Sequence, residues 1–134
     1  MKSIKLPRTI VNQLLRQAQL TPELEICGLI SAKDDSIYKV YPVNNIATDK
    51  QHMFDMDPGK QIQAMKTMRN NNETLFAIYH SHPDTPAEPS ITDIEQSSYP
   101  EALHLIISLS IKGVLEIKGF YIQQQSIEAV ELLI

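Results

Sequence analysis

The sequence of 134 residues contains no tryptophan, only four glycines and a single cysteine, Cys27. With one cysteine no disulfide can form inside the chain, which fits a reducing compartment. No stretch approaches the roughly 20 apolar residues that a membrane span needs. The N-terminus also lacks the unbroken apolar run and the cleavage site of a signal peptide. We therefore expect a cytoplasmic protein that makes no membrane contact.

Basic residues are outnumbered by acidic ones, 12 against 16, and they form no run. The formal net charge of -4 and the missing basic run argue against a nucleic-acid partner. The hydrophobic fraction of 43% is ordinary for a globular protein. We find no repeat, low-complexity segment or linker, so we expect one domain over residues 1–134. Nothing in the sequence sets an oligomeric state.

Apolar spacing predicts helices that alternate with strands. Residues 7–20 show the steps of three and four that are typical of an amphipathic helix. A second helix is predicted to start with Asp57 as its N-cap and Pro58 in its first turn, with an apolar face of Ile62, Met65 and Met68. Strands are expected over residues 26–32, 37–43, 52–56, 74–82, 102–110 and 113–123, a third helix over residues 90–98, and a strand or short helix over residues 126–134.

This order of elements predicts an α/β fold with a mixed sheet and helices packed on both of its faces. The strand over residues 74–82 is rich in branched and aromatic residues, so we place it in the centre of the sheet. Proteins of this class usually carry their sites at the end of such a strand.

That strand ends in "YHSHP", and its two histidines predict a metal site. Side chains two residues apart in a strand share a face, so His80 and His82 would lie together. Pro83 favours extended geometry in the residue before it. Asp93 is the natural third ligand, because a loop stiffened by prolines returns the chain to the same place. Two histidines and one carboxylate leave an open position on zinc, as in catalytic sites, and no second cysteine is present for a closed structural site.

Each half of this pattern also has a plain structural interpretation. Two histidines at this spacing occur often by chance, and Ser90 with Asp93 forms a weak capping box at a helix start. The combination of H-S-H-P with S-I-T-D at this distance is far more specific than either half.

The combination resembles the signature of the JAMM (MPN-plus) metallopeptidase family, in which a distant glutamate is followed by H-x-H-P and S-x-x-D. The segment "EICGLI" is similar to the family's upstream E-x-C-G-L segment. The resemblance implies the deaminase-like three-layer α/β/α fold and one zinc ion held by His80, His82 and Asp93. It also implies that Glu25 is the general base and acid, and that Ser90 donates a hydrogen bond to the oxyanion.

Several other residues compete for these roles. Glu23 is the alternative base, and the match to "EICG" favours Glu25. We expect Cys27 to be a core residue beside the site, His104 to be a satisfied core histidine, and His52 to be no ligand. We expect capping and oxyanion binding to compete for the single hydroxyl of Ser90, and the resemblance favours oxyanion binding. 

The resemblance to compact prokaryotic members of this family implies a ubiquitin-like or sulfur-carrier protein with a Gly-Gly tail as the substrate. The expected activity is a zinc-dependent peptidase or isopeptidase that cuts the amide bond after that tail. Two alternatives remain open. One is a non-catalytic scaffold that binds partners, as metal-free members of the superfamily do, and the other is an amidohydrolase that acts on a small molecule.

Overall fold

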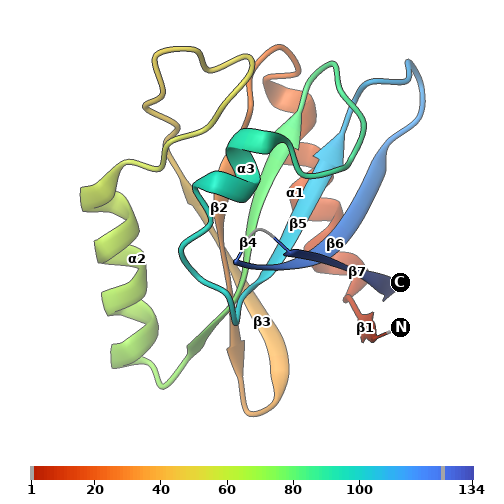
Figure 1. Cartoon of the computed structure of the whole chain (residues 1–134). Coiled ribbons are helices and arrows are strands. Elements are labelled where there is room, and N and C mark those ends of the chain that lie inside the picture. The colour runs from red at the N-terminus through yellow and green to blue at the C-terminus, as the bar shows by residue number, and fades with distance from the viewer. Residues whose placement is uncertain (1, 125) are drawn as a thin grey trace.

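The computed structural model describes residues 2–124 and 126–134, and they form an α/β fold around one seven-stranded mixed sheet (Figure 1). The sheet order is β1-β7-β6-β5-β4-β2-β3. No helix in these two ranges is both long and apolar enough to cross a membrane. The strands are β1 (Ser3–Lys5), β2 (Cys27–Lys33), β3 (Ser36–Val43), β4 (Thr74–His82), β5 (Leu103–Ser108), β6 (Glu116–Gln123) and β7 (Ser126–Leu133).

Strand β4 lies inside the sheet, as predicted, and ends with the two histidines. It pairs with β2 in antiparallel fashion, with Cys27 opposite His80, and with β5 in parallel fashion, with His80 beside Ile106. Six consecutive residues at the end of β4 are buried. The end of this strand is therefore held from both sides.

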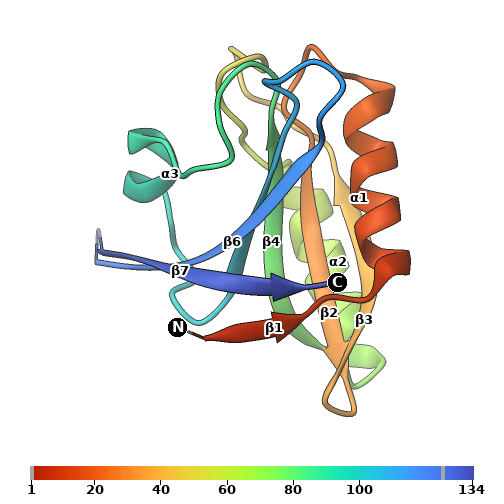
Figure 2. The same ribbon diagram turned by 90° about the vertical axis from the view of Figure 1, so that its right-hand side faces the viewer.

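Strand β1 was not predicted. It has three residues and pairs in parallel with β7, with Ser3 beside Glu131. A strand this short has no alternation to detect, and its partner lies at the other end of the chain. The same pairing brings the two ends of the chain together, and it confirms the strand alternative for residues 126–134 (Figure 2).

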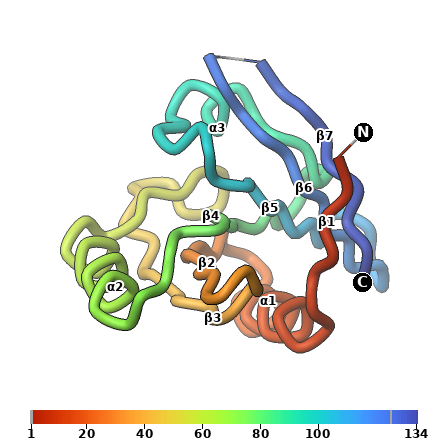
Figure 3. The backbone as a smooth tube through the Cα atoms, turned by 90° about the horizontal axis from the view of Figure 1, so that it is seen from below, coloured from red at the N-terminus to blue at the C-terminus, as the bar shows by residue number. Residues whose placement is uncertain are grey.

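The helices lie on both faces of the sheet, as expected (Figures 2 and 3). Helix α1 (Arg8–Leu20) covers one face and buries Ile10, Val11, Leu14 and Ala18. Helices α2 (Pro58–Asn70) and α3 (Ile91–Glu95) lie on the other face. The sheet, which contains the site strand β4, is thus the middle of three layers.

Helix α2 begins as the sequence predicts, since the carboxylate of Asp57 accepts hydrogen bonds from the backbone of Gly59 and Lys60. Its predicted apolar face was partly wrong. Met68 is buried, but Ile62 is 66% exposed. At about 3.6 residues per turn, Ile62 lies roughly a third of a turn around the helix from Met68, with Met65 between them.

Two further expectations were wrong. Helix α3 ends at Glu95 rather than near residue 98, because Gln96 forms its C-cap and the serines that follow offer no apolar face. Residues 52–56 form no strand, and a single bridge joins Asn45 to Met56. The segment between those two residues is a loop.

Gly28 in β2 leaves space for the ring of Tyr79, which crosses it on the α1 side of the sheet. The Tyr79 hydroxyl donates a hydrogen bond to the side chain of Gln17 in α1. A Cβ atom on Gly28 would overlap the end of the Tyr79 ring and lie 2.6 Å from the carbonyl oxygen of Tyr41. The contact between α1 and the sheet therefore depends on a glycine at this position.

We predict that Gly28→Ala lowers the free energy of unfolding by about 1–3 kcal/mol, the usual cost of overpacking a core. Gly59→Ala is the matched control, since a Cβ there meets the Asp57 carboxylate at 3.5 Å, an ordinary contact. An alanine in that first helical turn should be neutral or stabilise by up to about 1 kcal/mol. Urea denaturation of both variants measures the difference, and equal stabilities would contradict the steric argument.

Candidate metal centre

The end of β4 brings His80 and His82 to one face of the sheet, the face that α2 and α3 cover. Ser81 between them turns away, and its hydroxyl oxygen accepts a hydrogen bond from the backbone N–H of Ile26 at 2.9 Å. The N–H of Ser81 donates to the carbonyl oxygen of Ile26 at 3.0 Å. The chain just before β2 therefore runs beside the end of β4, and it brings Glu25 to the two histidines.

The loop after Pro83 returns the chain to the histidines and places Asp93 in the first turn of α3. The hydroxyl of Ser108 in β5 donates to the carbonyl oxygen of Thr85 and holds this loop to the sheet. A capping box then fixes Asp93. Its Oδ2 accepts from the N–H of Ser90 at 2.9 Å, and its own N–H donates to the Ser90 hydroxyl at 3.0 Å.

Three side-chain atoms from β4 and α3 converge on one point. Nε2 of His80 lies 3.1 Å from Nε2 of His82, and Oδ2 of Asp93 lies 3.0 Å from the first and 3.2 Å from the second. The three side chains are at most 8% exposed. The structure thus brings together the three residues that the sequence predicted as ligands.

The tautomer of His82 shows that this cluster fits a cation. Nδ1 of His82 lies 2.8 Å from the carbonyl oxygen of Pro86, which only accepts, so Nδ1 carries a proton. In neutral His82, Nε2 then presents a lone pair to the Asp93 carboxylate. Two electron-rich atoms at that distance repel unless a proton or a metal ion lies between them. Metal-bound histidines usually have this second hydrogen bond to a backbone carbonyl.

Two of the three predicted ligands, His80 and Asp93, are in charge states that suit metal binding. Burial by itself raises the pKa of Asp93, but hydrogen bonds from His80 and His82 outweigh it and hold that pKa far below its usual value. Burial lowers the pKa of His80. The pKa of His82 is raised, because its hydrogen bonds to Asp93 and Pro86 outweigh the effect of burial. An ionised Asp93 and a neutral His80 are the forms that bind metal.

Glu25 lies beside the cluster with its carboxyl group buried. The residue is 5% exposed, and its Oε1 has no hydrogen-bond partner among the described residues. Burial raises the pKa of Glu25 to about 8, although the charge of His82 opposes this. A carboxyl group with a pKa near neutrality can both take and return a proton.

Glu25 and Asp93 both lie within reach of a metal held by the histidines. Ligand atoms of Glu25, His80 and His82 fall within 4.8 Å of one another. The oxygen of Asp93 is nearer, at 3.0 and 3.2 Å from the two imidazole nitrogens. Distance therefore favours Asp93 as the third ligand and leaves Glu25 free. Glu23, the competing base, is exposed, whereas Glu25 is buried.

Ser90 caps α3, and capping does not exclude a hydrogen bond from the same hydroxyl to an oxyanion. Its oxygen accepts from the N–H of Asp93, while a hydroxyl can donate its own proton at the same time. The expected competition between capping and oxyanion binding is therefore not required.

The remaining candidates have structural roles. Cys27 is fully buried, and its thiol donates to the carbonyl oxygen of Val43. Burial raises the pKa of this thiol to about 12, which fits a core residue rather than a nucleophile. His104 is buried beside the hydroxyl of Ser97, as expected of a core histidine. His52 is exposed and pairs with Asp49.

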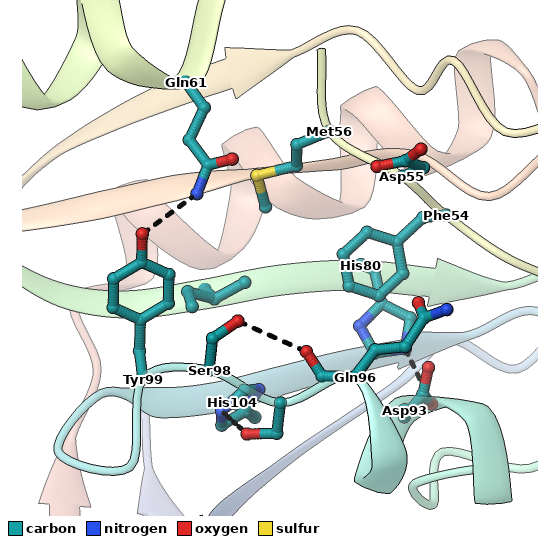
Figure 4. A pocket seen from close by; sticks show the side chains of 12 residues that line it. Phe54, Asp55, Met56, Gln61, His80, Asp93, Gln96, Ser98, Tyr99 and His104 are labelled. Atoms are coloured by element: carbon teal, nitrogen blue, oxygen red, sulfur yellow. Dashed lines mark hydrogen bonds and ion pairs between the residues drawn. The ribbon is translucent and has the colours of Figure 1, made fainter. Parts of the chain in front are cut away.

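The loop between Asn45 and Met56 is part of the site, although nothing in the sequence predicted this. Phe54 stacks on the ring of His80, with ring centroids 4.4 Å apart. A pocket of about 140 Å³ opens beside that contact, between this loop and the segment after α3 (Figure 4). His80 and Asp93 line it, so the pocket is open to the metal centre. A polar, irregular segment has no periodicity that would have placed it here.

Curated relatives of this chain carry peptidase names. The desampylase of Haloferax volcanii is 29% identical over 89 residues, 65% of this chain and 64% of that protein. The CysO-cysteine peptidase of Mycobacterium tuberculosis is 29% identical over 101 residues, 74% of this chain and 68% of that protein. The chain thus spans slightly less than two thirds of the desampylase.

Solved structures share the whole fold. Protein DSY2949 from Desulfitobacterium hafniense is 33% identical, with a TM-score of 0.79 over 99% of this chain and 92% of that one. A JAB1/MPN domain protein from Archaeoglobus fulgidus, 18% identical, has a TM-score of 0.58 over the full length of both chains, which supports the fold alone.

The family described as prokaryotic homologs of the JAB domain matches residues 7–119, a range that holds Glu25, both histidines and the capping box. The fold, the resemblance of the motifs and this match agree, and the chain belongs to that family.

Proposed function

We propose that this protein is a zinc-dependent peptidase or isopeptidase that hydrolyses the amide bond after the Gly-Gly tail of a ubiquitin-like or sulfur-carrier protein. One observation supports it most strongly. The Nε2 atoms of His80 and His82 and Oδ2 of Asp93 lie within 3.2 Å of one another, a donor set that suits zinc. The buried carboxyl group of Glu25, whose Oε1 has no hydrogen-bond partner among the described residues, lies next to them.

Zinc bound by His80, His82 and Asp93 would supply Lewis-acid chemistry, polarising the substrate carbonyl and making a water molecule nucleophilic near neutral pH. Glu25 takes the proton of that water as the new C–O bond forms. The same carboxyl group then gives the proton to the amine nitrogen as the C–N bond breaks. Its raised pKa suits both steps, because the group is neither a strong acid nor permanently protonated.

Ser90 lies three residues before Asp93 in the capping box, so its hydroxyl is fixed next to a ligand. Its oxygen accepts from the Asp93 backbone, and its proton is free to stabilise the negative oxygen that develops on the carbonyl. The rigid first turn of α3 would thus supply both a ligand and an oxyanion donor.

The relatives support this substrate class, since they are named a desampylase and a CysO-cysteine peptidase. A tail that ends in Gly-Gly is narrow, and it would reach the metal through the pocket between the loop at Phe54 and the segment after α3, which His80 and Asp93 line. A direct test is incubation with a ubiquitin-like protein extended beyond its Gly-Gly by a short peptide. We expect cleavage at that bond that stops with a chelator and returns with zinc. Failure to cut any such fusion would argue for a small-molecule amide instead.

We predict that Glu25→Gln keeps zinc and lowers kcat by about 10²–10⁴-fold, because glutamine fills the same space and cannot carry a proton. Glu23→Gln is the control from the same segment, where the side chain is exposed, and it should behave as wild type. Zinc content by elemental analysis and kcat on the fusion substrate measure the two effects. Full activity in Glu25→Gln would assign the base to another group.

We also predict that wild-type protein binds one zinc ion per chain and that His82→Ala loses both zinc and activity. His52→Ala should keep both, since its imidazole is exposed and bonds only to Asp49 among the described residues. Protein purified without zinc that also fails to take it up would favour a partner-binding scaffold. Equal zinc content in wild type and His82→Ala would show that the ion binds elsewhere.

A further inference from the structure

We propose that the loop from Asn45 to Met56, here called the clamp loop, positions the catalytic carboxyl group of Glu25, and that Asn45 is the positioning residue that closes it. This inference rests on the proposed role of Glu25 as the base. It concerns how that residue is held, which neither the fold nor the family match assigns.

Asn45 closes the clamp loop with four hydrogen bonds from one side chain. Its Oδ1 accepts from the N–H groups of Ala47 and Asp55, both at 3.0 Å. Its Nδ2 donates to the carbonyl oxygen of Met53 at 3.1 Å and to that of Glu25 at 3.0 Å. Three of these bonds fold the loop on itself, and the fourth ties it to the base. The amide uses both of its N–H groups and both acceptor sites.

Glu25 is bound to the clamp loop at both of its backbone polar groups. Its N–H donates to the carbonyl oxygen of Lys50 at 2.8 Å, and its carbonyl oxygen accepts from Asn45. Ser81 of β4 contacts the residues on either side of Glu25: Ile26 exchanges hydrogen bonds with it, and its hydroxyl donates to the carbonyl oxygen of Leu24 at 3.5 Å. Glu25 itself makes no backbone hydrogen bond to the sheet among the described residues, and both of its backbone polar groups bond to the clamp loop.

The same loop also contacts the two other parts of the site. Phe54 stacks on His80, and the side-chain amide of Gln51 donates to Asp84 in the proline loop at 3.4 Å. One segment thus touches the base, a metal ligand and the loop that leads to Ser90. Because it holds Glu25 by the backbone alone, the carboxyl group remains free for proton transfer.

The geometry predicts what loss of these bonds does. The ligands His80, His82 and Asp93 are set by β4 and the capping box, which Asn45 does not touch. Misplacement of a catalytic group by about 1 Å can cost on the order of 100-fold in rate. Weakening the clamp should therefore lower kcat without releasing the metal.

Asn45→Asp is the sharpest test, since aspartate has the same shape and keeps an oxygen for Ala47 and Asp55 but cannot donate to Glu25 or Met53. Asn44→Asp is the matched control, with the same charge change one residue earlier on an exposed side chain. We expect Asn45→Asp to keep wild-type zinc content and an unchanged visible spectrum with cobalt in place of zinc. Its kcat should fall at least about tenfold below that of Asn44→Asp, with KM unchanged.

A second measurement needs neither metal nor substrate. Hydrogen exchange of the Glu25 amide reports whether its bond to Lys50 stays closed. In Asn45→Asp we expect that amide to exchange at least about tenfold faster than in Asn44→Asp, while the buried amides of β4 and β5 keep their protection. This readout stands even if no carrier protein is cleaved, so it separates failure of the clamp from failure of the proposed activity.

Four results would overturn the inference. The first is a kcat of Asn45→Asp within twofold of its control. The second is loss of activity in proportion to lost zinc. The third is faster exchange throughout the sheet, which would make Asn45 a general stabilising residue. The fourth is unchanged exchange at Glu25, which would show that Asn45 does not hold that residue. If Asn45→Asp does not fold, Asn45→Ser replaces it, because serine adds no charge. Asn44→Ser is then the control.

Discussion

The crowding of three electron-rich atoms at the end of β4 is the constraint on which the structure depends. Nε2 of His80, Nε2 of His82 and Oδ2 of Asp93 lie 3.0–3.2 Å apart in a buried cluster, where charges are poorly screened. It is held because each side chain is fixed from behind by its own element: β4 is paired on both sides, and Asp93 is held by the first turn of α3.

Hydrogen bonds from neighbouring residues keep the three side chains of the cluster in place. Pro86 sets the tautomer of His82, and Ser90 orients Asp93. Both residues belong to the turn between β4 and α3, and Ser108 holds that turn to the neighbouring strand. A short helix is sufficient here, because the capping box that fixes Ser90 and Asp93 lies in its first turn. The later residues of α3 hold neither side chain, so the helix can end at Glu95.

The sequence was sufficient for the parts of the site that depend on local geometry. Alternation in β4 placed His80 and His82 on one face, Asp57 marked the start of α2, and the S-x-x-D pattern marked the start of α3. Features that depend on distant partners were missed. Strand β1 exists through its pairing with β7, and the clamp loop exists through contacts of Asn45 with Glu25 and of Phe54 with His80. Neither has a periodicity of its own, so only the assembled fold defines them.

Different segments hold the proposed metal ligands and the proposed base. His80, His82 and Asp93 come from β4 and α3, whereas Glu25 precedes β2 and its backbone bonds to Lys50 and Asn45 of the loop. The segments that carry the two groups touch at three places: Phe54 against His80, Gln51 against Asp84, and the residues beside Glu25 against Ser81. The side chain of Asn45 bonds to Glu25 and to the loop itself. A substitution that removes only these bonds leaves β4 and the capping box in place, so it can alter the rate of the chemistry more than the binding of the ion.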